Sequence, residues 1–458
     1  MASRAACRPP APAARPGRRR RDGTRIPIDC AGGQPDFEPP RAPAHAVRDG
    51  SATGARGAAV TRRRPVAMVV HSYYEEDPRV RREAEAVRAA GRGVDVFSLR
   101  RDGDPAEGVL NGVRVHRLDV QRHQGAGIGT YLLEYADFMA RAAIALTRAH
   151  GRRRYALVQV HTIPDALVAA ALPLRLLGVP VILDMHEAMP EFFRMRFPGA
   201  SRPAVHRALV AQERASIAVA NAVITVNDAL AARLVALGVP ALKVHVVMNA
   251  PVLARFNPSA HPPRPFMADG TLRLVYAGAL SMVYELDVAL EAVARLRAQR
   301  PGLPITLDLY GRDFAEVPLR DQAAALGLAD AVTFHGRVPL DEVPAALAAA
   351  DVGLAPTRRT PFTDFSLSTK IFEYAAMGKP VVASRLPMVE ATFPPGTVAT
   401  YTAGDAGALA SAIAGLVDDA PAREAAVARS MALVGELAWE RVSERYLALL
   451  DGLARDGN

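Results

Sequence analysis

Lysine, cysteine and long apolar runs are all scarce in this chain of 458 residues. Only three of the 56 basic side chains are lysines, and both cysteines, Cys7 and Cys30, lie near the start of the sequence. From residue 65 onward the sequence therefore offers no disulfide and no cysteine metal ligand, and we expect a reducing, cytoplasmic environment. No run of 18 apolar residues is free of charged residues, so the sequence predicts no transmembrane helix.

The positive net charge belongs to one end of the sequence. Residues 1–64 contain 14 Arg and 5 acidic residues, a net charge of +9, whereas the other 394 residues contain 42 charges of each sign. This segment is rich in Arg, Pro, Ala and Gly and lacks the apolar region of a secretory signal, so we expect a disordered extension. A tether for nucleic acid or anionic lipid and a misassigned start codon are both open alternatives for it. Because residues 65–458 carry equal numbers of positive and negative charges, the sequence argues against a nucleic-acid-binding protein.

From residue 65 onward, short apolar segments alternate with longer segments rich in Ala, Leu and Arg. This alternation predicts an α/β fold with parallel sheets. A proline-rich break at 257–266 separates two such series and predicts two doubly wound domains, residues 65–256 and 267–430, followed by a helix at 431–458. Ligands of doubly wound sheets bind at the carboxyl ends of the strands. The strands are expected at about 66–72, 93–99, 112–118, 156–161, 180–185, 222–227, 243–248, 272–278, 305–311, 332–335, 352–355, 380–384 and 397–401.

The segment 364–380 has the densest set of candidate binding groups. Two of the three lysines, Lys370 and Lys379, lie in it. In a chain so rich in Arg, a Lys suggests a need for a compact, mobile ammonium group. The pattern predicts a short helix over residues 369–377 that ends at Gly378.

The start of this helix is a candidate anion-binding site. Free backbone N–H groups and the positive end of the helix dipole attract anions, and Ser368, Thr369 and Lys370 lie there. Glu373, one turn further on, is placed to accept hydrogen bonds from sugar hydroxyls. The plainer alternative is a capped, packed helix with solvated charges.

Residues 369–382, Thr-Lys-Ile-Phe-Glu-Tyr-Ala-Ala-Met-Gly-Lys-Pro-Val-Val, resemble the nucleotide-sugar motif of glycosyltransferase family 4, the group 1 retaining enzymes of the GT-B fold. The resemblance covers about residues 65–458. It implies two Rossmann-like domains that face each other across a cleft, with a C-terminal helix that crosses back. It also implies metal-independent transfer of a sugar from a nucleotide-sugar donor to a glycan, lipid-linked or small-molecule acceptor, as in polysaccharide biosynthesis.

The resemblance also assigns roles on the donor side. Glu373 matches the acidic residue that hydrogen-bonds the donor ribose, and Lys370, at the helix start that holds the diphosphate, is a candidate catalytic residue. The first Glu of the motif's usual pair would fall at Phe365, so that half of the motif is missing. The full set of donor-binding candidates is Glu373, Ser368, Thr369, Lys370, Gly278, Arg337 and Arg312.

The sequence departs from the family after Gly278. Ala279 replaces an Arg, and Tyr284 and Glu285 stand where a Lys is expected; together these two cations usually clamp the diphosphate. Buried phosphates need cationic partners. Without compensation the protein would be inactive or would bind its donor in another geometry. The cations available for compensation are Lys370, Arg312, Arg337 and Arg358.

Other candidates follow strands of the first domain. His186 and Glu187 end one strand and His161 ends another, and the resemblance places a His of this kind near the reacting sugar. His186 is therefore a candidate catalytic residue, and His161 and Glu187 are candidates for the acceptor side. Asp77 and Arg79, after the first strand, would also line that side. A strand-capping His and a salt-bridged helix start are the structural alternatives.

Two other functions stay open at this stage. A UDP-sugar 2-epimerase shares the two-domain architecture, but its acid–base chemistry needs several carboxylates in the cleft and the sequence offers few. A non-catalytic sugar-nucleotide-binding protein would agree with the missing Arg and Lys. The Asp-Gly-Asp at 102–104 imitates a metal motif of the other glycosyltransferase fold, but it lies in a Gly/Pro loop, and we expect neither a metal ion nor a cofactor.

The segment 130–149 predicts a helix with one unusually apolar face. We expect that face to be buried against the first sheet. Peripheral contact with a membrane is the alternative, because acceptors in the family are often lipid-linked. The apolar side chains are Tyr131, Leu132, Leu133, Tyr135, Phe138 and Met139.

Overall fold

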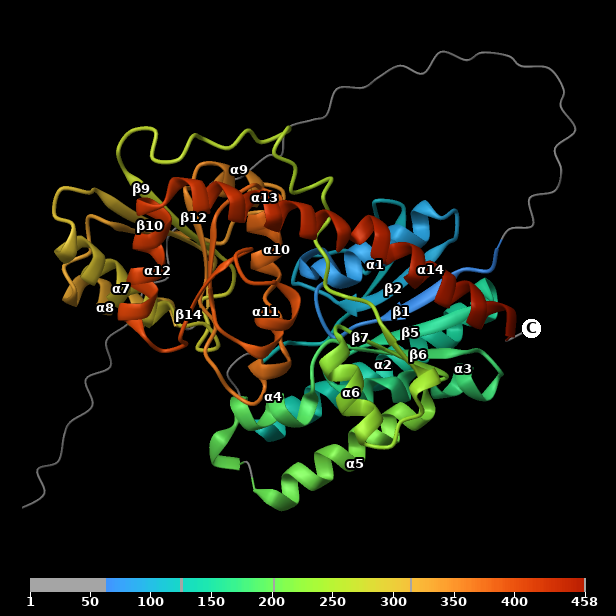
Figure 1. Cartoon of the computed structure of the whole chain (residues 1–458). Helices are drawn as coiled ribbons and strands as arrows, with labels where there is room; N and C mark the ends of the chain where they lie inside the picture. Colours follow the sequence, from blue (N-terminus) through green and yellow to red (C-terminus); the bar gives the residue numbers. More distant parts are fainter. Residues whose placement is uncertain (1–62, 124–126, 201, 314, 457–458) are drawn as a thin grey trace, which may run out of the picture. The chain divides into compact units, whose positions relative to one another are not determined.

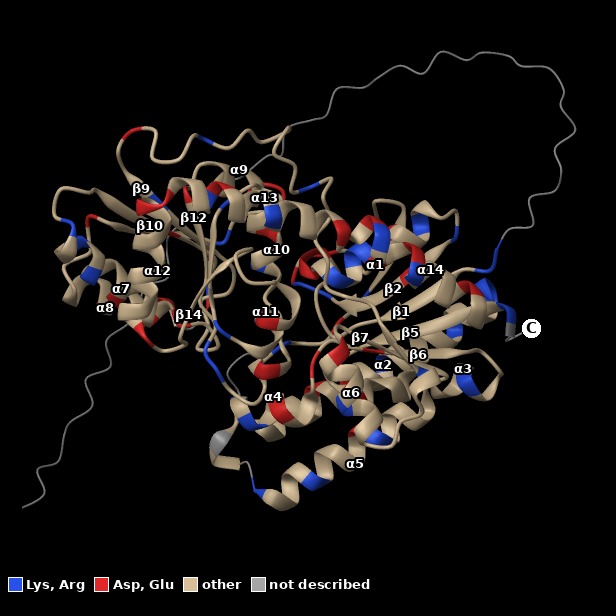
Figure 2. Ribbon diagram, viewed as in Figure 1, with Lys and Arg blue, Asp and Glu red and all other residues tan. Residues whose placement is uncertain are grey.

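The computed structural model describes residues 63–123, 127–200, 202–313 and 315–456. The extension expected to be disordered, residues 1–64, lies almost wholly outside the described residues. The described chain belongs to one compact unit with two β-sheets flanked by helices (Figure 1). Charges of both signs are found throughout it (Figure 2), in line with the balanced composition after residue 64.

The first sheet has eight strands in the order β3-β4-β2-β1-β5-β6-β7-β8. All neighbours are parallel except β3 and β4, which are antiparallel. The central strands β1, β5 and β6 are buried along their whole length, as expected for a parallel sheet with helices on both faces. The strands are β1 (Val66–Val69), β2 (Val94–Leu99), β3 (Glu107–Leu110), β4 (Val113–Leu118), β5 (Leu157–His161), β6 (Val181–Met185), β7 (Ala222–Thr225) and β8 (Val244–Val246).

Capping residues set the helix starts in this half. The Asp77 side chain accepts a hydrogen bond from Val80 N at the start of α1, and Pro78 occupies its first turn. The helices are η1 (Tyr74–Glu76), α1 (Pro78–Ala89), α2 (Ile128–Arg153), η2 (Asp165–Ala171), α3 (Leu172–Leu176), α4 (Met189–Arg196), η3 (Pro198–Ala200), α5 (Pro203–Val219), α6 (Asp228–Ala236) and η4 (Ala241–Lys243).

The second sheet has six parallel strands in the order β11-β10-β9-β12-β13-β14. Its strands are β9 (Leu272–Ala277), β10 (Ile305–Tyr310), β11 (Val332–Gly336), β12 (Val352–Ala355), β13 (Val381–Ser384) and β14 (Ala399–Tyr401). Its helices are α7 (Leu286–Gln299), α8 (Glu316–Ala325), α9 (Val343–Ala348), η5 (Thr363–Phe365), α10 (Thr369–Ala376), α11 (Pro387–Thr392) and α12 (Ala406–Asp418).

Each sheet contains one point where the strand order reverses. In the first sheet it lies between β1 and β5, and in the second between β9 and β12. Chain segments leave such neighbouring strands toward opposite faces, which opens a crevice at the carboxyl ends. The predicted motif helix α10 follows β12, so it starts at the crevice of the second sheet.

The C-terminal helices confirm the predicted return to the first domain. α13 (Ala420–Glu436) ends before α14 (Trp439–Asp456), and α14 runs alongside α1 (Figure 1). Trp439 N donates a hydrogen bond to Pro251 O at 3.0 Å, and Tyr446 Oη donates one to Gln159 Oε1 at 2.7 Å. The side chains of Trp439, Tyr446 and Leu450 are part of the same core as strands of the first sheet.

Two features differ from the sequence-based expectations. β3 was not predicted, because Glu107–Leu110 is a mostly exposed edge strand without a continuous apolar run. In α2 the buried side chains are Glu134, Phe138, Ala142 and Leu146. Leu132 and Leu133, expected on the buried face, are instead 63% and 74% exposed. No helix in the described part of the chain is long and apolar enough to cross a membrane.

Candidate active site

A pocket of about 810 Å³ opens at the carboxyl ends of both sheets. Its walls come from loops after β1, β2 and β4 in the first sheet, from loops after β9, β10 and β11 in the second, and from the first turns of α10. The lining residues are Tyr73, Glu76, Arg101, Arg122, Phe256, Ala277, Gly278, Ala279, Tyr310, Gly311, Arg312, Asp313, Arg337, Val338, Leu340, Val343, Thr369, Lys370 and Glu373.

Gly278 and Gly311 allow the backbone to approach unusually closely at the floor of this pocket. Gly278 has φ +153°, and a Cβ atom there would lie 2.2 Å from Lys370 Cε. A Cβ on Gly311, at φ +137°, would lie 1.8 Å from Gly278 O. Gly278 N donates to Tyr310 O at 2.8 Å, so it is not available to a ligand. The absence of a side chain at Gly278 instead leaves space for the Lys370 side chain.

Lys370 is held by aromatic rings. Its Nζ lies 3.9 Å from the ring centroid of Tyr284 and 5.1 Å from that of Tyr276, and the residue is only 6% exposed. Among the described residues, no carboxylate forms an ion pair with this ammonium group. Tyr284, which stands where a Lys was expected, thus orients the lysine without cancelling its charge.

Glu285 and Arg358 have structural partners away from the pocket lining. Glu285 accepts hydrogen bonds from Tyr401 Oη at 3.1 Å and from Gly404 N at 2.9 Å. Arg358 Nη2 lies 2.9 Å from both carboxylate oxygens of Asp287. Neither residue lines the pocket, so Arg358 is not a compensating cation there.

The start of α10 brings the other donor-side candidates together. Thr369 and Glu373 line the pocket with Lys370, whereas Ser368, the N-cap, does not. The Ser368 hydroxyl is buried and has no hydrogen-bond partner among the described residues. Burial raises the pKa of the Glu373 carboxyl, and the Lys370 ammonium opposes that rise. No described side chain bonds to Glu373, so its oxygens are available to a ligand.

Arg312 and Arg337 line the pocket in different ways. The Arg337 guanidinium makes two bonds to Glu76, at 2.7 and 2.8 Å, and thereby links a loop of the second sheet to η1 of the first. Arg312 has a side chain that is 74% exposed and lies 4.0 Å from Glu316, a weak pairing. Arg312 is therefore the less firmly paired of the two cations.

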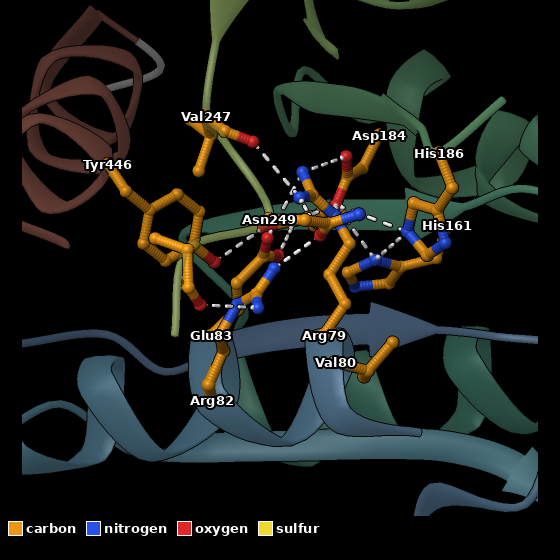
Figure 3. Close-up of polar contacts among 12 residues, drawn as sticks. Arg79, Val80, Arg82, Glu83, His161, Asp184, His186, Val247, Asn249 and Tyr446 are labelled. Atoms are coloured by element: carbon orange, nitrogen blue, oxygen red, sulfur yellow. Dashed lines mark hydrogen bonds and ion pairs between the residues drawn. The ribbon is translucent and has the colours of Figure 1, made fainter. Parts of the chain in front are cut away.

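His161 and His186 meet at a buried carboxylate (Figure 3). Asp184 Oδ2 lies 3.0 Å from His161 Nδ1 and 3.5 Å from His186 Nε2. Arg79 donates to both oxygens of Asp184, at 2.7 and 3.1 Å. Burial alone would raise the pKa of Asp184, but Arg79 and the two His rings hold that pKa well below its ordinary value.

Arg79 lies in the core of this network. It is buried, does not line the pocket, and also donates to Val247 O and Asn249 Oδ1 in the segment that leaves the first sheet (Figure 3). The sequence placed Arg79 on the acceptor side, whereas its contacts are those of a residue that positions Asp184. The two His residues and Asp184 are close enough to hold a metal ion, but the guanidinium already neutralises Asp184 and would repel a second cation.

The remaining acceptor-side candidates lie around this edge of the sheet. Asp77 accepts hydrogen bonds from Val80 N at 3.1 Å and Ser72 Oγ at 2.8 Å, so it caps α1. Glu187 is partly buried, and burial raises the pKa of its carboxyl while His186 opposes that rise. Neither Asp77 nor Glu187 lines the pocket.

The first-sheet side of the pocket was not predicted from the sequence. Tyr73, Glu76, Arg101 and Arg122 line it, and none was a candidate. The available signal was their position directly after predicted strands, where ligands of doubly wound sheets bind. Glu76 lies in η1 and the other three residues lie in loops. None belongs to a recognisable motif, so composition alone could not select them.

Two parallel α/β domains around a pocket, with a terminal helix that returns to the first domain, define the GT-B class of glycosyltransferases. The profile described as "Glycosyl transferase 4-like domain" matches residues 77–250, and that described as "Glycosyl transferases group 1" matches residues 271–419. The chain belongs to the group 1 glycosyltransferases of family 4, and it is a glycosyltransferase.

Three similar proteins illustrate this relationship. Glycogen synthase of Mycobacterium tuberculosis is 28% identical over 385 residues, which cover 80% of this chain and 89% of the relative. The structure of sucrose-phosphate synthase from Thermosynechococcus elongatus superposes with a TM-score of 0.69 at 20% identity, over 85% of this chain and 99% of that one. An Anabaena protein in complex with UDP-glucose has a TM-score of 0.61 at 17% identity, over 84% of this chain and 99% of that one. The two structures establish the fold alone.

Proposed function

We propose that this glycosyltransferase is a retaining, metal-independent enzyme that transfers a sugar from a nucleotide-sugar donor to a glycan, lipid-linked or small-molecule acceptor. The observation that carries the proposal is the Lys370 ammonium, which lies in the pocket beside Glu373 without a carboxylate partner among the described residues. A buried cation without a counter-ion is costly unless a ligand anion completes it. A diphosphate at the start of α10 would supply that anion.

The donor has a consistent path through the second domain. The diphosphate would contact Lys370, Thr369 and the exposed Arg312, and the ribose of the donor would hydrogen-bond Glu373. The Tyr310 ring, which stacks on His335 at a centroid distance of 4.2 Å, lines the same side of the pocket. The Anabaena protein binds UDP-glucose, which makes a uridine nucleotide the first donor to test.

Among its described residues, the first-sheet wall of the pocket, where the acceptor is proposed to bind, offers no unpaired carboxylate, and this supports retention of configuration. An inverting enzyme needs a general base to take the acceptor's proton. Of the described lining residues from the first sheet, only Glu76 is a carboxylate, and it is engaged by Arg101 and Arg337. In the retaining route the bond from the sugar to the leaving phosphate breaks as the acceptor oxygen attacks from the same face, and that phosphate takes the acceptor's proton. Lys370 would then stabilise the charge of the departing diphosphate.

His186 does not line the pocket, and the role near the reacting sugar that the sequence suggested for it stays a prediction. Its backbone N–H is bonded to Thr162 Oγ1 at 3.1 Å, and its ring is bonded to the His161–Asp184 pair. These contacts fix the ring position at the carboxyl end of β6. A fixed ring favours a positioning role for the donor sugar over a role as a mobile base.

Nucleotide binding and transfer test this proposal in two steps. Thermal shift and calorimetry with UDP, GDP, dTDP and ADP should identify one nucleotide that binds wild-type protein and binds the Lys370→Met variant more weakly. Lys243→Met is the matched control, because Lys243 donates to Ile217 O and does not line the pocket. NMR of the product formed from the matching nucleotide-sugar should show the donor's anomeric configuration. An inverted anomer would disprove retention, and no binding of any nucleotide would disprove the donor class.

The family matches favour an enzyme over the non-catalytic nucleotide-sugar binder that Ala279 and Tyr284, in place of the usual diphosphate clamp, left open in the sequence. Single-turnover measurement separates the two. Tight donor binding without transfer or donor hydrolysis would favour the binder. Release of nucleotide from bound donor would favour the enzyme.

A further inference from the structure

The first-sheet wall of the pocket contains a group of arginines that the donor path does not use. The Arg101 guanidinium lies 4.7 Å from the ring centroid of Tyr73, and the Arg122 guanidinium lies 5.9 Å from the same centroid. All three side chains line the pocket. They come from separate loops after β2, β4 and β1, so the fold gathers them at one place. We call Tyr73, Arg101 and Arg122 the arginine–tyrosine wall.

Positive charge exceeds negative charge at this wall. Glu76 pairs with Arg101, and the same carboxylate also binds Arg337. One carboxylate is thus shared by two guanidinium groups. Within the described part of the chain, Arg122 has no ion pair of its own. Arg122 is also exposed, so its guanidinium contributes little to folding and is free to meet a ligand.

The loop that carries Arg122 is held in place by a buried acid. Glu134 of α2 has a side chain that is 1% exposed, and its Oε2 accepts a hydrogen bond from His123 N at 2.7 Å. Its Oε1 lies 3.1 Å from His71 Nε2, but neither atom makes a hydrogen bond of acceptable geometry within the described residues. The hydrogen bond from His123 N is therefore the contact by which this buried carboxylate holds the backbone beside Arg122.

We propose that the acceptor carries a phosphate group and that Arg101 and Arg122 bind it, with Tyr73 orienting the two guanidinium groups. This inference rests on the proposed function and names the acceptor class for the same pocket. The planar guanidinium fork matches phosphate oxygens in two-point contacts, and aromatic faces hold such groups in place. The donor diphosphate is already served by Lys370 on the opposite, second-sheet wall. A negatively charged phosphate on the acceptor would balance the excess positive charge of Arg101 and Arg122 on the first-sheet wall.

The phosphate could belong to a soluble sugar phosphate or to a lipid-linked sugar diphosphate, and acceptor assays separate these sources. With the donor found above, transfer would be measured to glucose and fructose, to their 6-phosphates, and to a prenyl-diphosphate-linked hexose in detergent. We expect the phosphorylated acceptors of one source to be used and the unphosphorylated sugars to be poor. Equal transfer to phosphorylated and unphosphorylated acceptors would overturn the inference.

A direct binding assay does not depend on the identity of the acceptor. Inorganic phosphate would be titrated into wild-type protein saturated with the nucleotide that binds, by calorimetry or ³¹P NMR. Arg122→Gln should weaken phosphate binding by about tenfold, the scale for losing one charged hydrogen-bond partner, and leave nucleotide affinity within about twofold. Arg100→Gln is the matched control, because Arg100 pairs with Asp119 and does not line the pocket.

The outcomes distinguish this inference from the function on which it rests. If no nucleotide binds, the proposed function itself fails. If the nucleotide binds but Arg122→Gln leaves phosphate affinity unchanged, only the acceptor phosphate site fails. If Arg122→Gln weakens the nucleotide as much as Lys370→Met does, the arginine–tyrosine wall belongs to the donor and the inference is wrong.

Discussion

Lys370 offers the most direct test of the donor site. Lys370→Met removes the charge and keeps most of the length of the side chain, which matters because Gly278 leaves space for that chain. The ammonium has no ion pair within the described residues and contacts the rings of Tyr276 and Tyr284. We therefore expect the variant to fold and its melting temperature to change little.

The expected loss follows from the burial of the cation. A hydrogen bond to a charged group contributes about 1.5–3 kcal/mol, so nucleotide diphosphate affinity should fall about 10- to 150-fold. The loss in kcat should be larger, on the order of 100- to 1,000-fold, because negative charge on the leaving diphosphate grows in the transition state. Because Ala279 stands in place of the usual Arg, that position offers no second cation to stabilise the negative charge of the leaving diphosphate.

Calorimetry with the nucleotide and single-turnover kinetics with its sugar give the two quantities. Ala279→Arg in the Lys370→Met background should recover part of the lost turnover, because that position faces the same pocket. Full turnover in Lys370→Met would refute the reasoning and place the anion site elsewhere. If nucleotide affinity falls as expected but kcat is unchanged, Lys370 contributes to ground-state binding alone.

Four further predictions follow from individual residues. Glu373→Ala should weaken nucleotide binding by roughly 2 kcal/mol by calorimetry, since a charged acceptor for neutral hydroxyls is lost, with the fold intact by circular dichroism. Gly278→Ala should reduce donor binding in the same assay, because its Cβ would lie 2.2 Å from Lys370 Cε and displace that chain. Removal of residues 1–60 should leave melting temperature and nucleotide affinity unchanged, since that sequence has no core-forming pattern. Burial raises the pKa of Asp165 to about 8. Between the unfolded pKa near 4 and pH 8, the folded state therefore keeps a proton that the unfolded state releases, and the free energy of unfolding should fall as pH rises. Asp165→Asn should flatten the dependence of melting temperature on pH.

The architecture could be predicted from the sequence because it depends on repeated patterns. The apolar segments of parallel strands recur along the chain, and one proline-rich break divides them into two series. All but one of the observed strands lie within or close to the expected ranges. β3 was missed because an edge strand needs no apolar run. The helix α10 was found through its start and its end at Gly378, which has φ +64°.

Only the second-sheet wall of the pocket could be predicted from the sequence, because its residues belong to a recognisable motif and those of the first-sheet wall do not. Lys370 and Glu373 belong to one contiguous motif. Arg101 and Arg122 lie in unrelated loops and meet at Tyr73 only after the strands are ordered in space. The place of Arg79 after the first strand suggested a contact with the acceptor. In the structure its guanidinium pairs with Asp184 and Glu83 and does not line the pocket, so a role toward the acceptor stays a prediction.

The pocket also accounts physically for the missing diphosphate clamp. A Lys where Tyr284 stands would lie close to Lys370, and the two ammonium groups would repel each other in the absence of ligand. An acid there would cancel the charge that a diphosphate needs. An aromatic face stabilises the ammonium by about 1–2 kcal/mol where it is desolvated, and it leaves the full positive charge for the ligand. If the diphosphate binds as proposed, Lys370 and the exposed Arg312 would supply its cations, so the loss of the usual pair does not by itself argue against catalysis.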